Sequence, residues 1–208
     1  MSPFVRNYRY IVFAIAMAYW SNLYIMYGFQ FLHYLTNWGL TSSVICAGLL
    51  AYESAFQKKL RINSFVIATF CLNAVVMILY WKLYFKDPDL LYAGRTPMPW
   101  YRDDYVHLLC PLTQMFDALV LKQAFSNRLF KGMVYYLCIS FSYSVCSEFL
   151  FALPYPFMWD LDLGQRIAFY VQGQLTGVFA FVMGVTLSFL FKKYGLTQFF
   201  QKQKRVSV

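Results

Sequence analysis

Long apolar blocks separated by short charged stretches make up most of this chain. A helix needs about 20 apolar residues to cross the hydrocarbon core of a bilayer. Six blocks approach that length and are bounded by charge, which predicts an all-α, polytopic membrane protein with six transmembrane helices in one bundle. The expected spans cover about residues 10–27, 40–56, 62–84, 106–125, 133–153 and 167–191.

The first and the fourth blocks are the least regular. Arg6 and Arg9 precede an apolar stretch with small residues at Ala16 and Ala18, a pattern that a cleaved signal peptide also shows. The stretch continues beyond Ala18, which favours an uncleaved first span. The fourth block carries several polar residues and a proline, and its charged flanks favour a span.

Composition agrees with a single integral membrane domain over residues 1–208. Apolar residues make up 60% of the chain and charged residues 13%, and the mean hydropathy is +0.47. These values exclude an ordinary soluble globular domain. Aromatic residues reach 22%, which is typical of helices that end among lipid headgroups.

The net charge of +9 is unevenly distributed and predicts the orientation. Lysine and arginine stay preferentially on the cytoplasmic side of a membrane. With six spans and cytoplasmic N and C termini, 13 of the 18 basic residues fall in cytoplasmic segments. The basic segment 192–208 then forms a cytoplasmic tail suited to anionic lipid. No nucleic-acid motif accompanies it, so no nucleic-acid partner is expected.

Cysteine and histidine usage argues against disulfide or metal chemistry. The five cysteines lie inside expected spans without a paired Cys-x-x-Cys spacing, and there are only two histidines. The sequence contains neither a P-loop nor a dinucleotide-binding glycine motif nor a Gly-x-Ser-x-Gly elbow. No cofactor is implied.

The fourth expected span carries a polar stripe. At 100° per residue one helix face collects Asp103, His107, Cys110, Gln114 and Asp117. Polar groups are costly inside a membrane, so this face is expected to point into the bundle. There Asp117 would be satisfied by neighbouring spans, through Asn73, Glu148 or Gln172. Asp103 and Glu148 are the candidate carboxylates for orienting His107, with Glu148 the more plausible partner on another span.

Thr36 is the candidate nucleophile. Taken alone it is most simply the N-cap of the second span. The expected topology, however, places Thr36 and His107 on the same outer face of the membrane. A hydroxyl nucleophile needs a base within hydrogen-bond reach, and histidine suits that role near neutral pH. His33, three residues before Thr36, is a rival base that is also explained as an interfacial side chain.

Several short motifs resemble the androgen-induced protein family, which includes the androgen-dependent TFPI-regulating proteins. They are Leu35-Thr36 at the second span, the Tyr80-Trp81-Lys82-Leu83-Tyr84 helix end, Asp103-Asp104-Tyr105-Val106-His107, Tyr155-Pro156-Phe157, and Gly164-Gln165-Arg166. The resemblance covers nearly the whole chain. It implies a multi-pass membrane hydrolase of fatty acid esters of hydroxy fatty acids, with Thr36 as nucleophile and His107 as the histidine.

One departure from the family pattern concerns the base. Where the family has an Asn-His pair, this chain has Asp103 and Asp104. Nearby carboxylates favour the charged form of a histidine, so they are expected to raise the basicity of His107 and to alter or abolish activity.

The favoured hypothesis is a membrane-embedded lipid ester hydrolase of the endoplasmic reticulum. Asn37 and the amides at the start of the second span are candidate oxyanion donors. Substrate is expected to enter sideways from the lipid, because the loops are short. Two alternatives stay open: a non-catalytic lipid-binding or scaffolding subunit of a larger membrane complex, and a transporter using Asp117, Gln114 and Asn73.

Overall fold

The computed structural model describes residues 2–92, 99–151 and 153–195, and all the regular elements in these ranges are helical. The elements in chain order are α1 Pro3–Tyr27, η1 Gly28–His33, α2 Leu35–Ala55, α3 Asn63–Lys86, α4 Asp89–Tyr92, α5 Trp100–Asp104, η2 Tyr105–Leu109, α6 Cys110–Phe116, η3 Asp117–Leu121, η4 Ala124–Ser126, α7 Leu129–Phe149, η5 Pro156–Met158 and α8 Leu163–Lys193. The all-α fold is therefore confirmed.

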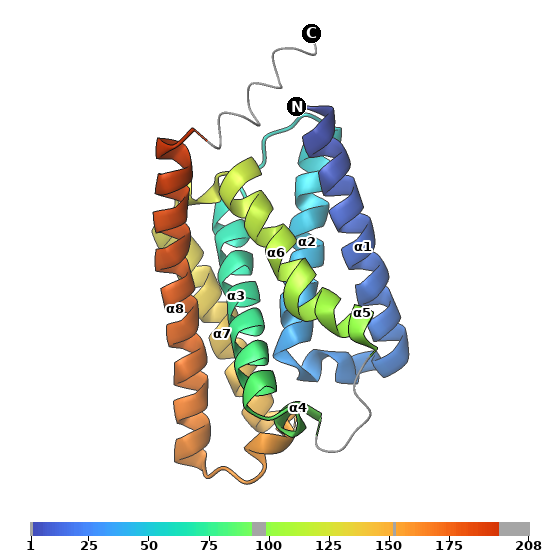
Figure 1. Ribbon diagram of the computed structural model, residues 1–208, viewed down its shortest axis with the longest axis vertical. Coiled ribbons are helices and arrows are strands. Elements are labelled where there is room, and N and C mark those ends of the chain that lie inside the picture. Colours follow the sequence, from blue (N-terminus) through green and yellow to red (C-terminus); the bar gives the residue numbers. More distant parts are fainter. Residues whose placement is uncertain (1, 93–98, 152, 196–208) are drawn as a thin grey trace.

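Helix α3 forms the centre of the bundle. It packs against α2, α6, α7 and α8 and supplies much of the buried apolar core (Figure 1). Helix α1 reaches the core mainly through α2. The start of α1 and the end of α8 lie at one end of the bundle, whereas α4 and the α7–α8 connection lie at the opposite end (Figure 1). The site described below lies toward this second end.

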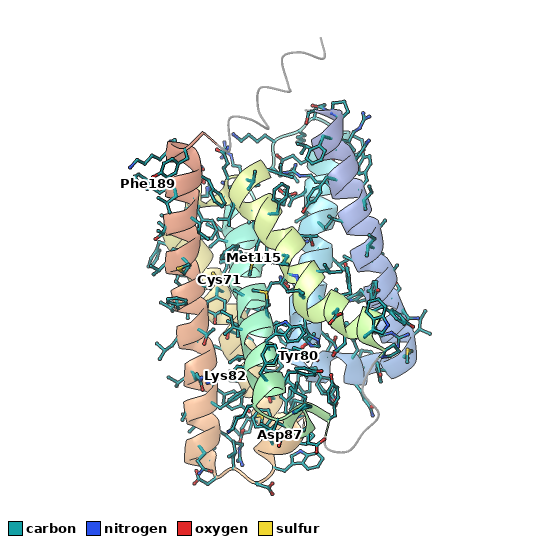
Figure 2. All side chains as sticks on the ribbon, viewed as in Figure 1. Cys71, Tyr80, Lys82, Asp87, Met115 and Phe189 are labelled. Atoms are coloured by element: carbon teal, nitrogen blue, oxygen red, sulfur yellow. The ribbon has the colours of Figure 1, made fainter. Side chains whose placement is uncertain are left out.

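Four helical segments in the described ranges are long and apolar enough to cross a membrane. They are Pro3–His33, Asn63–Lys86, Leu129–Phe149 and Leu163–Lys193. Their outer faces carry large apolar side chains, such as Phe189, which points outward from α8 (Figure 2). Such faces suit contact with lipid. These long apolar helices indicate an integral membrane protein. The other two expected spans, α2 and the run from α5 to η3, hold buried polar residues, so the count of six stays a prediction.

Helices α1 and α8 begin earlier than their apolar blocks because polar caps start them. The Ser2 side chain accepts a hydrogen bond from the amide of Val5. At α8, Asp162 and Gln165 form a reciprocal capping box, which places the first helical residue at Leu163 rather than at 167. Hydrophobicity alone finds the apolar length of a helix, and the caps decide where it begins.

The fourth predicted span is a helical run from Trp100 to Leu121 that contains two π-helical segments, η2 and η3. In each, an amide bonds to a carbonyl five residues earlier: Cys110 to Tyr105, and Lys122 to Asp117. Pro111, which has no amide hydrogen, follows the first segment. π-Helical turns inside α-helices occur frequently at functional sites. One of these turns carries His107 and the other carries Asp117.

Candidate active site

Thr36 and His107 meet at the junction of α2 and η2. Helix α2 begins at Leu35, with Tyr34 in the N-cap position, so Thr36 is inside the first turn. The expectation that Thr36 caps the helix is therefore wrong, and its hydroxyl is free for another role. Thr36 Oγ1 lies 3.1 Å from Nε2 of His107. The His107 side chain is buried.

The ring of His107 is held in one tautomer by a backbone acceptor. Nδ1 lies 3.0 Å from the carbonyl oxygen of Asp103 in hydrogen-bonding geometry. A carbonyl oxygen can only accept, so Nδ1 carries the hydrogen and Nε2 presents its lone pair. Nε2 therefore accepts from the Thr36 hydroxyl. This is the arrangement that a general base needs before it removes a proton.

The carboxylate of Asp103 lies beside the same ring nitrogen. Its Oδ1 is 3.0 Å from Nδ1 of His107, and its Oδ2 accepts hydrogen bonds from the hydroxyls of Tyr80 and Tyr92. Burial acts to raise the pKa of Asp103, but interactions with His107, Tyr80 and Tyr92 outweigh burial and hold this pKa below its ordinary value. Asp103 is thus an anion placed to stabilise a protonated His107.

Tyr80 also fixes the plane of the imidazole. The rings of Tyr80 and His107 are stacked, with centroids 3.5 Å apart and planes 9° from parallel. Tyr80 lies in the lower part of α3, toward Asp87 (Figure 2). In the sequence, Tyr80 belongs to a helix-end motif that indicates no chemical role, and Tyr92 belongs to no motif. Nothing in the spacing shows that these tyrosines converge on Asp103.

Tyr155 is a further neighbour that the sequence did not identify as functional. It lies in the connection between α7 and α8, just before η5. Its hydroxyl oxygen accepts a hydrogen bond of 3.1 Å from the amide of Leu35, and the side chains of Thr36 and Tyr143 lie near the same hydroxyl. Burial raises the pKa of Tyr155 to about 12.

These groups border a cavity of about 290 Å³. This volume is near the lower end of the range of roughly 300–1,000 Å³ that is typical of ligand pockets. Part of the cavity lining is polar and comes from Thr36, His107 and Asp103 with the surrounding tyrosines. Its other walls are apolar, from Leu23, Val76, Leu79, Leu83, Leu91, Val106, Phe157 and Phe169. A few convergent polar groups in an apolar pocket suit a mostly hydrophobic ligand with one reactive polar group.

The structure gives three predicted supporting residues different surroundings. Glu148 forms an ion pair of 2.8 Å with Arg166 and accepts from Tyr170, whereas the carboxylate beside His107 belongs to Asp103. Asn37 lines the cavity, but its amide group already donates to the carbonyl of Phe31 at 2.6 Å. Gln114 is buried on α6 and is not among the cavity-lining residues.

Asp117 has a different partner from those expected. It forms a buried ion pair with Arg9 of α1, with Nε and Oδ2 2.8 Å apart. Asn73 instead hydrogen-bonds to Ser43. The polar stripe does face the interior, because His107, Cys110, Gln114 and Asp117 are all buried. Arg9, one of the 13 basic residues assigned to cytoplasmic segments, is buried in this pair.

His33 contacts residues other than Thr36. Its ring stacks on Phe151, with centroids 4.7 Å apart, and its carbonyl accepts from the hydroxyl of Tyr143. In the part of the chain that the structure describes, the histidine bonded to Thr36 is His107.

Comparison with known proteins gives one family. A family model described as FAR-17a/AIG1-like protein matches residues 4–189, which include every residue of the site described above. The match confirms the family resemblance found in the sequence motifs. No curated protein and no solved structure matches the chain.

Proposed function

Because this chain belongs to the FAR-17a/AIG1-like protein family, we propose that it is a membrane-embedded hydrolase of lipid esters. The observation that carries the proposal is the 3.1 Å contact between Thr36 Oγ1 and His107 Nε2, two residues that line a mostly apolar cavity. The nucleophile and base of covalent catalysis need this reach, with the base oriented by a third group. The carbonyl and carboxylate of Asp103 supply that orientation.

In the proposed reaction, Thr36 Oγ1 attacks the ester carbonyl while Nε2 of His107 takes its proton. The protonated imidazole is stabilised by the adjacent Asp103 carboxylate, and it then gives the proton to the departing alcohol. The acyl group remains on Thr36 as an ester. A water molecule, deprotonated by His107, attacks this ester and releases the fatty acid, which restores the Thr36 hydroxyl.

The proposed substrate is a hydrophobic ester, such as a fatty acid ester of a hydroxy fatty acid, that reaches the cavity from the bilayer. Apolar side chains form most of the cavity wall, so an acyl chain is the natural occupant. The family resemblance implies the same substrate class.

We further propose six spans, with both termini in the cytosol and residence in the endoplasmic reticulum. This proposal is supported by the common end of the bundle at which α1 begins and α8 ends (Figure 1). A C-terminal tag should then be digested by protease added to intact microsomes. A protected tag in intact microsomes, digested only after detergent is added, would contradict this orientation.

The hydrolase is tested by turnover of a long-chain ester in detergent micelles, comparing Thr36→Ala with Thr41→Val. Both residues are threonines of α2, but the Thr41 hydroxyl accepts from Trp20 and donates to the carbonyl of Asn37, and Thr41 is not among the cavity-lining residues. Thr36→Ala should lose turnover and Thr41→Val should keep it. A wild-type protein without turnover would favour the alternative, a non-catalytic lipid-binding or scaffolding subunit.

A further inference from the structure

The Tyr155 hydroxyl lies beside the start of α2. It accepts the amide hydrogen of Leu35 at 3.1 Å, and it lies close enough to the Thr36 side chain to interact with it. Tyr155 also lines the cavity beside Thr36 and His107. The Tyr155 hydroxyl therefore lies beside the start of α2, the proposed nucleophile and the cavity that would hold substrate.

The hydrogen of this hydroxyl points away from the Leu35 amide. A phenol has one hydrogen to donate, while its oxygen can accept. The Leu35 amide approaches the oxygen as a donor, so the phenol hydrogen points away from Leu35. The remaining polar neighbours are Thr36 and Tyr143 and, when substrate is present, its carbonyl oxygen.

We propose that Tyr155 is a further catalytic residue, whose O–H donates a hydrogen bond to the substrate oxygen as that oxygen becomes negative. The inference rests on the proposed hydrolase function. It gives Tyr155 the side-chain oxyanion role expected of Asn37, one of whose two amide hydrogens is already bonded to the Phe31 carbonyl. The amide of Thr36, in the first turn of α2 and without an intrahelical acceptor, is the natural second donor.

The electron and proton movements balance without a further reactant. The bond from Thr36 Oγ1 to the carbonyl carbon forms, the carbonyl π pair moves onto oxygen, and the Thr36 proton goes to His107. Tyr155 keeps its own proton and only shares it with the new oxyanion. When the carbonyl re-forms, the bond to the alkoxy group breaks, and that group takes the proton from His107. Burial keeps the pKa of Tyr155 at about 12, so the phenol stays protonated at neutral pH.

Tyr155→Phe tests this role because it removes the hydroxyl and keeps the ring. Tyr170→Phe is the matched control, since it removes a hydroxyl that bonds to Ser147 and Glu148 and does not line the cavity. Loss of one oxyanion donor typically lowers kcat by about 10²–10³-fold, so Tyr155→Phe should show that loss with KM nearly unchanged. Tyr170→Phe should keep the wild-type kcat.

A second readout separates catalysis from folding. A long-chain alkyl trifluoromethyl ketone forms a tetrahedral oxyanion on a hydroxyl nucleophile, whereas the matching fatty alcohol does not. Tyr155→Phe should weaken inhibition by the ketone at least tenfold and leave inhibition by the alcohol unchanged. If both weaken equally, or if Tyr155→Phe keeps the wild-type kcat while Thr36→Ala is inactive, Tyr155 is not the oxyanion donor although the hydrolase stands. A wild-type protein that neither turns over ester nor binds the ketone overturns the hydrolase and this inference together.

Discussion

Two buried polar clusters lie on the same helical run, and they differ in charge balance and in access to space. The cluster around η2 joins Thr36, His107 and Asp103 beside a cavity. The cluster around η3 joins Asp117 to Arg9, whose guanidinium also donates to Ser54, and neither charged residue lines that cavity. Both clusters belong to the polar stripe that the sequence predicts.

The difference shows how similar polar patterns separate into a structural and a chemical role. In the η3 cluster, the Arg9 guanidinium donates two hydrogen bonds to the Asp117 carboxylate, so the two charges are neutralised within the protein. In the η2 cluster, the Asp103 carboxylate is surrounded by the ring of His107 and two tyrosine hydroxyls. Such an anion is placed to stabilise the imidazole of His107 when that ring takes a proton during a reaction.

The largest effect is expected from substitution of His107, the proposed general base of the η2 cluster. His107→Ala should lower turnover of a long-chain ester by about 10²–10⁴-fold, the usual contribution of a positioned general base. His33→Ala, which removes a ring stacked on Phe151, should change turnover little. If only His33→Ala loses activity, the assignment of His107 is wrong.

The η3 cluster should determine stability rather than chemistry. Asp117→Ala removes the carboxylate that neutralises the buried Arg9 guanidinium, so it should lower the free energy of unfolding by about 3–5 kcal/mol. The double variant Arg9→Met, Asp117→Leu removes both charges and should recover most of that loss. Denaturation in detergent measures both, with turnover per folded molecule as the control. A folded Asp117→Ala protein that has lost its kcat would place Asp117 in the chemistry instead.

Asp103→Asn should have an intermediate effect on the rate. The backbone carbonyl of Asp103 still holds the tautomer of His107, so only the stabilising charge is lost. Loss of such an orienting partner typically costs about 10–100-fold, and kcat/KM should fall by that amount. A fall near ~10⁴-fold, as when the wrong tautomer forms, would show that the carboxylate rather than the carbonyl selects the tautomer.

The smallest effect concerns acid stability. The folded pKa of Asp103 is below its ordinary value, so its contacts stabilise the protein at pH values above that ordinary value. This contribution is lost as the pH falls through the folded pKa. The difference in Tm between wild type and Asp103→Asn should therefore be constant at neutral pH and shrink as the pH falls below the ordinary aspartate pKa of about 3.9. A difference that grows on acidification would contradict the lowered pKa.

The helical class and the pairing of Thr36 with His107 could be expected from sequence. Both depend on the lengths and the order of the apolar blocks along the chain. Apolar block length predicts helices, and alternating spans place the ends of α2 and of the fourth segment on one face. The family resemblance selected the same two residues. The match to residues 4–189 confirms that family, while the catalytic roles remain proposals.

Other features depend on contacts that no spacing encodes. The two π-helical segments shift the angular positions along the stripe, so a uniform 100° step cannot show which neighbour Asp117 meets. The pairing of Glu148 with Arg166 depends on how α8 begins, which the Asp162 cap determines. The approach of Tyr155 to Leu35 joins segments 120 residues apart across an irregular connection. Side-chain direction in such a connection is not periodic.

The most direct test of the central claim is covalent labelling of the nucleophile. Purified protein is treated with a long-chain fluorophosphonate, digested, and analysed by mass spectrometry for the modified peptide. Nε2 of His107 should activate the Thr36 hydroxyl, so the adduct should be on Thr36. The adduct should persist in Thr41→Val and Thr36→Ser and vanish in Thr36→Ala and His107→Ala. An adduct on another residue, or labelling that survives Thr36→Ala, would contradict the account.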